Sequence, residues 1–129
     1  MKKLVFSLTF IAISLIANCQ DKANIQAVIA GYKSNDTIQM ADFLKLSEIS
    51  LNNKDYWIVG FTMLFKDGMY DIELGSDSNK ITVAMKSAFR NLKERSDKIK
   101  YIVFKDITVQ KTQTKKIKID DLVCKLKLE

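Results

Sequence analysis

The sequence predicts a mainly β protein: a β-sandwich-like domain of about six to seven strands, one packed α-helix and one short helix, preceded by an N-terminal signal helix. Short runs alternate between apolar and polar residues, which is the period of half-buried strands, and one run has helical periodicity. The chain has 129 residues, 47% hydrophobic and 28% charged, which fits one globular domain. We therefore divide it into a signal segment (residues 1–19), a short tether (20–24) and a single domain (25–129).

Residues 1–19 have the pattern of a signal peptide. A positively charged start precedes a 14-residue apolar run at positions 4–17, shorter than the stretch of about 20 residues that crosses a bilayer. The run ends in Leu-Ile-Ala-Asn-Cys, which resembles a bacterial lipobox, and Cys19 would then be the lipidated first residue. Alternatively, ordinary cleavage after Cys19 would leave Gln20 first in a secreted chain. Both alternatives predict export to the periplasm or outer membrane of a diderm bacterium, or to the outside.

The strongest local signal is a β-hairpin over residues 56–74. Two alternating runs flank Asp67-Gly68, a pair that suits a two-residue turn because both positions tolerate a positive φ. This turn predicts that Phe65 faces Tyr70 and that Phe61 faces Leu74. One face of the hairpin would then be wholly apolar. We expect this face to consist of Trp57, Val59, Phe61, Met63, Phe65, Tyr70, Ile72 and Leu74.

A helix is predicted over residues 82–93. Thr82 can cap its start, and the apolar residues that follow have the spacing of one helix face. They are Met85, Ala88, Phe89 and Leu92, and we interpret this stripe as core packing. A shorter helix is expected near residues 40–46, where the composition favours helix.

The other segments read as strands, over residues 25–32, 48–51, 99–109 and 117–128. In the third, the pattern predicts an inward face of Ile99, Tyr101, Val103, Ile107 and Val109. In the last, the apolar positions change from odd to even at Asp120-Asp121. This change predicts a β-bulge or a short break, which would keep both apolar sets in the core.

Basic residues are concentrated in the second half of the chain. Residues 20–79 carry 5 basic and 9 acidic side chains, a net charge of −4, whereas residues 80–129 carry 14 and 6, a net charge of +8. Such a surface can attract an anionic partner, but lysines on an edge strand can also serve only to block sheet-to-sheet pairing. Both interpretations stay open for six residues of the last loop and strand, which are Lys111, Lys115, Lys116, Lys118, Lys125 and Lys127.

The residue types offer little for catalysis or metal binding. The chain has no His and only 2 Cys, so its composition lacks the commonest general base and the usual zinc ligands. Cys124 shares a strand face with Leu122 and Leu126, so we expect it to be buried and inert. Asp71 and Glu73 lie on the polar face of the hairpin, where we expect solvation. The sequence therefore predicts no enzyme activity, no cofactor, no metal and no nucleic-acid partner.

Four stretches resemble one known family. They are GYKSNDTIQMADFLKL (31–46), YWIVGFTMLFKDGMYDIELGSDSNKIT (56–82), AFRNLKERSDKIKYIVFKDITV (88–109) and IDDLVCKLKL (119–128). Together they resemble the C-terminal domain of the gliding-motility protein GldM, a periplasmic component of the type IX secretion machinery of Bacteroidetes-type bacteria. The turn at residues 110–115 departs from the family pattern, because it contains neither Pro nor Gly.

The resemblance implies a small β domain that contacts other envelope proteins. We therefore expect a non-catalytic interaction module, held at the membrane by a lipid if Cys19 is modified, with an envelope protein as its partner. One alternative is a small exported enzyme or enzyme inhibitor with an unrecognised site. Another is a basic module that binds anionic envelope polymers or lipids.

Overall fold

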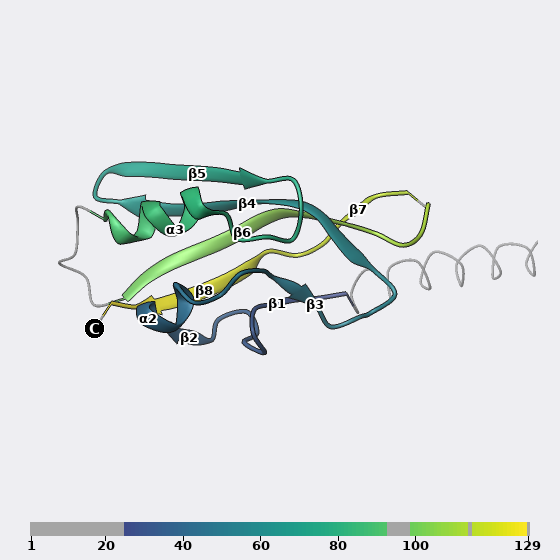
Figure 1. The fold of residues 1–129 in the computed structure, drawn as a ribbon, viewed down its shortest axis with the longest axis horizontal. Helices are drawn as coiled ribbons and strands as arrows, with labels where there is room; N and C mark the ends of the chain where they lie inside the picture. The colour runs from purple at the N-terminus through teal and green to yellow at the C-terminus, as the bar shows by residue number, and fades with distance from the viewer. Residues whose placement is uncertain (1–24, 93–98, 114, 129) are drawn as a thin grey trace, which may run out of the picture.

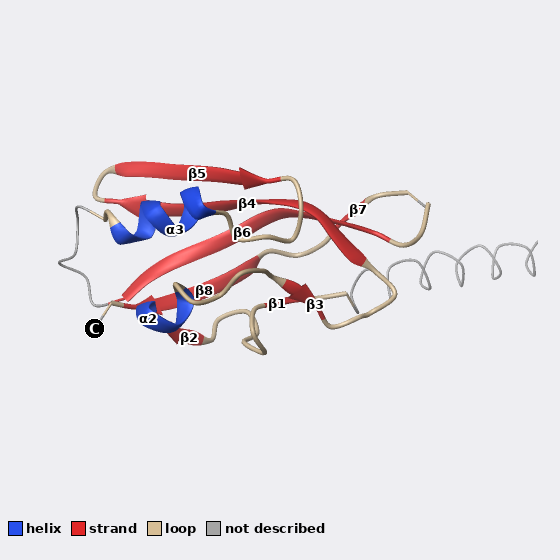
Figure 2. Cartoon of the chain, viewed as in Figure 1, coloured by secondary structure: helices blue, strands red, loops and turns tan. Residues whose placement is uncertain are grey.

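The computed structural model of the chain describes residues 25–92, 99–113 and 115–128. The expected signal helix and the tether, residues 1–24, lie outside these ranges. Within them the protein is mainly β, with eight strands and two short helices (Figures 1 and 2), which confirms the predicted fold class. The strand number exceeds the expected one because several strands are only two or three residues long.

Six strands form the main sheet. They are β2 (Thr37–Gln39), β4 (Trp57–Asp67), β5 (Tyr70–Ser76), β6 (Ile99–Gln110), β7 (Ile117–Lys118) and β8 (Leu122–Lys127). The order is β2-β8-β6-β4-β5, and β7 also pairs with β6. All pairs are antiparallel except β2 with β8. The long strand β5 and the short strand β2 are therefore the two edges.

A second, smaller layer lies against one face of this sheet. It consists of α2 (Met40–Phe43), α3 (Val83–Arg90) and an antiparallel pair of two-residue strands, β1 (Ala27–Val28) and β3 (Ser50–Leu51). Figure 1 shows α3 beside β4 and β6, and α2 with the β1–β3 pair beside β8 and β2. Buried residues from both layers form one continuous hydrophobic core.

Phenylalanine rings join the two layers at the centre of the core. Phe89 of α3 is fully buried, with its ring centroid 4.3 Å from that of Phe65 on β4 and 5.2 Å from that of Phe43 on α2. Aromatic pairs at such distances add about 0.5–1.5 kcal/mol to the effect of burial alone. These contacts hold both helices against the same face of the sheet.

Helix α3 forms where the sequence predicts it, although it is shorter. The Thr82 side chain accepts a hydrogen bond from the backbone N–H of Met85, as an N-cap should. Met85, Phe89 and Leu92 are buried as expected, but the helix ends at Arg90 instead of residue 93. The expected helix near residues 40–46 is likewise reduced, to Met40–Phe43.

The register of the hairpin differs from the expected one by two residues. Phe65 lies opposite Ile72, and Phe61 opposite Ser76. The turn is Gly68-Met69, and a positive φ of 66° at Gly68 puts glycine at the first central position, as in a type II′ turn. A shift of two preserves which residues share a face, so Phe61, Met63 and Phe65 remain buried.

Three residues that we expected on the inward face are exposed because two strands contain bulges. The pairing of β4 with β6 shifts around Gly60, so that Ile58 and not Trp57 points inward. On β6, Asp106 has a φ of 51°, and the inward positions change from even to odd there. Tyr70 is also exposed, beside the turn. The prediction of an inward Trp57, Ile99, Tyr101 and Tyr70 is therefore wrong, as these residues are 47%, 43%, 58% and 77% exposed.

The remaining strand predictions are partly confirmed. The break between β7 and β8 contains Asp120 and Asp121. On either side of it Ile119, Leu122, Cys124 and Leu126 are buried and Ile117 and Leu128 pack partly buried against the core, as the change of phase predicts. The expected strand over residues 25–32 is reduced to β1, because a turn with positive φ at Ala30 and Gly31 ends it. The expected strand over 48–51 is reduced to β3, and β2 was not predicted.

Candidate functional site

The second layer covers only one face of the main sheet. We call the other one the outer face, and among the described residues no helix or strand lies on it. It is formed by the alternate residues of four strands, which are Leu64, Lys66, Asp71, Glu73, Ile99, Tyr101, Val103, Lys105, Val123, Lys125 and Lys127. Their neighbours along each strand, such as Phe65, Ile102 and Cys124, point into the core.

The inner strands β4 and β6 form an apolar, slightly hollow patch towards the end of the sheet where β6 begins, and we call this patch the apolar centre of the outer face. A shallow depression of about 580 Å³ lies over β4 and β6 and is lined by Leu64, Tyr101, Val103 and Ile99, with Lys66 at its side. Tyr101 and Ile99 are 58% and 43% exposed. Exposed apolar groups that form one contiguous patch are typical of interaction sites, whereas scattered ones are not.

Charged side chains surround this apolar centre unevenly. On the β5 side, Lys105 forms an ion pair with Glu73, and the Nζ of Lys66 lies 3.8 Å from an Oδ1 of Asp71. The hydrogen bond to Glu73 raises the pKa of Lys105 above its ordinary value. On the β8 side, neither Lys125 nor Lys127 pairs with a carboxylate of the described chain. The outer face is therefore close to neutral at one side and positive at the other.

The structure divides the six candidate lysines into two groups. Lys125 and Lys127 belong to β8, opposite Tyr101 and Ile99 on β6. The other four lie around the loop from β6 to β7, at the opposite end of β6. A strand rises about 3.3 Å per residue, so Lys127, opposite Ile99, lies about 40 Å from Lys111, whereas Lys125, opposite Tyr101, lies about 23 Å from Lys118, opposite Thr108.

Two lysines of the second group have local partners. The Nζ of Lys111 lies 5.8 Å from the ring centroid of Tyr56, within the range of a cation–π contact. Lys118 lies 3.7 Å from a carboxylate oxygen of Asp106. Lys115 and Lys116 are exposed on the loop. All four lie at least about 23 Å from Lys125 and Lys127 along the sheet, so the six lysines do not form one compact site.

Of the two cysteines, only Cys124 lies within the described residues. Cys19 lies outside the described residues. Cys124 is fully buried in the core, where burial and, to a lesser degree, the charge of Asp36 raise the pKa of its thiol to about 12. A thiol in this environment stays protonated and is a poor nucleophile.

We expect the buried Cys124 to make the domain less stable in alkali. The unfolded-state thiol ionises above its ordinary pKa of 9.0, whereas the folded one resists ionisation up to about pH 12. The protonated thiol of Cys124 therefore makes its full contribution to the free energy of unfolding below pH 9.0. This contribution is lost as the pH rises towards 12, by up to about 1.4 kcal/mol per pH unit. Urea unfolding of Cys124→Ala should lack this part of the pH dependence, and identical profiles would contradict the assignment.

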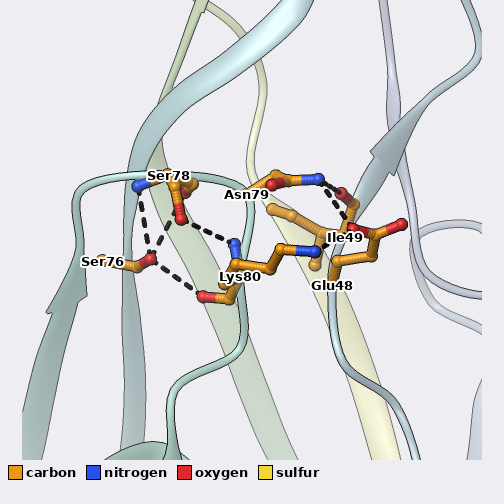
Figure 3. Close-up of polar contacts among 6 residues, drawn as sticks. All are labelled: Glu48, Ile49, Ser76, Ser78, Asn79 and Lys80. Carbon is orange, nitrogen blue, oxygen red and sulfur yellow. Dashed lines mark hydrogen bonds and ion pairs between the residues drawn. The ribbon is translucent and has the colours of Figure 1, made fainter.

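A polar cluster links the end of β5 to the segment before β3 (Figure 3). The Oγ of Ser76 donates to the backbone oxygen of Lys80 at 2.8 Å, and the Nζ of Lys80 lies 2.8 Å from an Oε2 of Glu48. The Nδ2 of Asn79 donates to the Oε2 of Glu48 and to the carbonyl oxygen of Ile49. The hydrogen bond from Lys80 and the positive charge of Lys80 hold the pKa of Glu48 below its ordinary value. The hydroxyl of Ser76 donates to a backbone carbonyl and the amine of Lys80 binds a carboxylate, so neither is activated as a nucleophile. The cluster joins two segments of the fold, and we call it the clasp.

Replacing Ser76 with alanine should lower the free energy of unfolding by about 1–2 kcal/mol, because the carbonyl of Lys80 loses its partner in a nearly buried site. Urea denaturation measures this change. Ser50→Ala, at an exposed serine of β3, is the matched control and should change stability by less than about 0.5 kcal/mol. Equal effects of the two substitutions would show that the clasp does not stabilise the fold.

A second hollow lies between the tip of the hairpin and α3. Its volume is about 750 Å³, and it is lined by turn residues such as Met69, which is 97% exposed, and by Ala88 and Asn91 of α3. Asp67 is the one charged residue of its lining. The outer face combines apolar and charged groups and is therefore the better candidate for specific recognition.

Asp71 and Glu73 lie on the outer face and pair with lysines, as expected of solvated carboxylates. Within residues 25–92, 99–113 and 115–128, no three acidic or cysteine side chains are grouped to hold a metal ion. In the same ranges, no helix has the length and hydropathy needed to cross a membrane.

Sequence reasoning missed the apolar part of the outer face. We assigned Ile99, Tyr101 and Val103 to the core, whereas Ile102 and Phe104 occupy it. A usable signal was present, because residues 101–104 are all apolar and a strand with one solvated face should alternate. A strand that is apolar on both faces needs a cover on both, and the described residues supply only one.

Neither a family model nor any curated protein matches this chain. The candidate site therefore depends on the geometry of the chain itself.

Proposed function

We propose that this protein is a non-catalytic interaction module of the cell envelope that docks a partner protein on its outer face. The observation that carries the proposal is the apolar centre of the outer face, which the described residues leave uncovered and where Tyr101 and Ile99 are exposed next to Leu64 and Val103. Tyrosine is enriched in energetically important contacts, because its large rigid ring buries apolar area and keeps a polar end.

The charges around this centre define the chemistry of the partner. Lys125 and Lys127 present two ammonium groups beside Tyr101 and Ile99, and no described carboxylate neutralises them. An extended segment with acidic residues flanking apolar ones would place carboxylates at the lysines and apolar side chains in the depression. Complementary charge of this kind gives selectivity and faster association more than it gives affinity.

The sequence supports a location in the envelope. The apolar run at residues 4–17 and Cys19 have the pattern of a lipoprotein signal, and the quoted motifs resemble the C-terminal domain of GldM, a module of envelope proteins. We propose that Cys19 carries the lipid that holds the domain at the membrane.

The lipid anchor is tested by Cys19→Ala. We expect this substitution to move the protein from the membrane fraction to the soluble fraction, because the covalently attached lipid is lost. Intact mass of the purified chain should fall by the mass of the lipid. Unchanged fractionation together with an unchanged mass would rule lipidation out and favour the secreted form.

Docking on the outer face is tested by recovering the partner from envelope extracts. Tyr101→Glu should abolish recovery, and raised salt should release the partner, because acidic contacts are screened. Tyr70→Glu is the matched control: it makes the same change at an exposed tyrosine that lies outside the outer face. Equal recovery by both variants would contradict the proposal. Turnover of an envelope substrate that single Asp substitutions abolish would instead support the enzyme alternative.

A further inference from the structure

One end of the molecule carries lysines and aromatic residues side by side. We call it the basic end and define it by Lys54, Tyr56, Trp57, Lys111, Lys115 and Lys116. Trp57, the first residue of β4, pairs with Gln110, the last residue of β6, so the segments that flank these strands meet here. The Nζ of Lys111 lies above the ring of Tyr56, and Trp57 is 47% exposed.

The described chain begins close to this end. The backbone N–H of Gln26 donates to the Oδ1 of Asn52 at 2.8 Å, and the N–H of Asn52 donates to the carbonyl of Gln26 at 3.0 Å. Asn52 precedes Lys54 by two positions and begins the loop that leads to Trp57. The first described residues, from Ile25, are thus tied to the loop that contributes Lys54 and Tyr56 to the basic end.

The tether limits how far this entry point can lie from the membrane. Cys19 precedes Ile25 by six positions, and a fully extended chain spans at most about 3.3–3.6 Å per residue, so the two lie within about 20 Å of each other. A lipid at Cys19 would therefore hold this end of the domain near the bilayer surface. Lys125 and Lys127 lie about 30–36 Å from the Trp57–Gln110 pair, at the other end of the main sheet.

We propose that the basic end rests on an anionic bilayer surface and so orients the domain on the membrane. This inference rests on the lipid anchor of the proposed function. Lysines near an anionic bilayer are attracted to its headgroups, and tryptophan and tyrosine favour the interface because one part of the ring system is apolar and the other polar. The loop itself carries one carboxylate, Asp55, and Asp106 on β6 is paired with Lys118, while Asp120 and Asp121 line a separate hollow beside Gln26 and Ala27.

Binding to vesicles tests this surface without the anchor. The chain from Gln20 onwards retains every residue of the hydrophobic core, which extends from Ile25 to Leu126. Trp57 is the only tryptophan of the sequence, so its fluorescence reports contact at this end. Phosphatidylcholine vesicles that contain phosphatidylglycerol should shift its emission to shorter wavelength, and vesicles of phosphatidylcholine alone should not.

Charge substitutions locate the contact. The triple variant Lys111→Gln, Lys115→Gln and Lys116→Gln should reduce partition into anionic vesicles by on the order of 100-fold, at roughly fivefold per lysine. The matched control removes three charges elsewhere, by Lys66→Gln, Lys125→Gln and Lys127→Gln, and should partition like the parent chain.

Several results would overturn the inference. These are an unshifted Trp57 emission with anionic vesicles at low salt, equal losses in the two triple variants, and binding of soluble inorganic polyphosphate without binding of vesicles. Tyr101→Glu should leave vesicle partition unchanged, so a failure of docking on the outer face can be distinguished from a failure at the basic end.

Discussion

Replacing Phe89 with alanine is expected to lower the free energy of unfolding by about 3–5 kcal/mol. The ring is fully buried where α3, α2 and β4 meet, at centroid distances of 4.3 Å from Phe65 and 5.2 Å from Phe43. Its removal costs the transfer energy of the side chain and leaves a cavity that three elements would have to move to close. Because domains are stable by only about 5–15 kcal/mol, urea denaturation should show a large fall in the midpoint.

The matched control lies on the same helix. Val83 is 78% exposed at the start of α3, so Val83→Ala should change the free energy of unfolding by less than about 0.5 kcal/mol. If Phe89→Ala cost no more than this control, α3 would not be packed on the sheet as the structure describes.

Replacing Tyr101 with alanine should weaken the binding of the partner by about 30-fold or more, the effect of removing a hot-spot residue. The fold should be unaffected, because Tyr101 is 58% exposed and lies on the face opposite the core. Titration of the recovered partner against the parent chain and the variant measures the ratio of the two dissociation constants.

Tyr70→Ala provides the comparison for this substitution. Tyr70 is 77% exposed at the tip of the hairpin, outside the outer face, and its removal should change affinity by less than about threefold. A larger loss for Tyr70 than for Tyr101 would move the docking surface to the hollow between the hairpin tip and α3.

The elements that depend on local chemistry could be predicted from the sequence. Thr82 followed by a regular apolar stripe predicted α3, and the change of phase at Asp120-Asp121 predicted the break between β7 and β8. Residue type and short-range spacing determine these features, and both can be read directly.

Features that depend on pairing between strands could not be predicted. The turn placed at Asp67-Gly68 lies one residue later, because glycine takes the first central position of a type II′ turn. The bulges near Gly60 and Asp106 reverse the inward face within β4 and β6, and such insertions are set by the partner strand.

The candidate site depended on these same features. Had β6 contained no bulge, Tyr101 and Val103 would have belonged to the core, as we expected, and the outer face would have lost its apolar centre. Likewise, the six lysines are close in the sequence, but the length of β6 separates Lys111 from Lys127 by about 40 Å. Only the topology of the sheet shows that they belong to two surfaces.

Site-specific photocrosslinking in intact cells tests the proposed docking surface most directly. A photoreactive phenylalanine analogue at position 101 should yield one crosslinked protein, joined through a segment with acidic residues next to apolar ones. The same analogue at position 70 should not yield this product. An absence of crosslinks at position 101, or the same products from both positions, would contradict docking on the outer face.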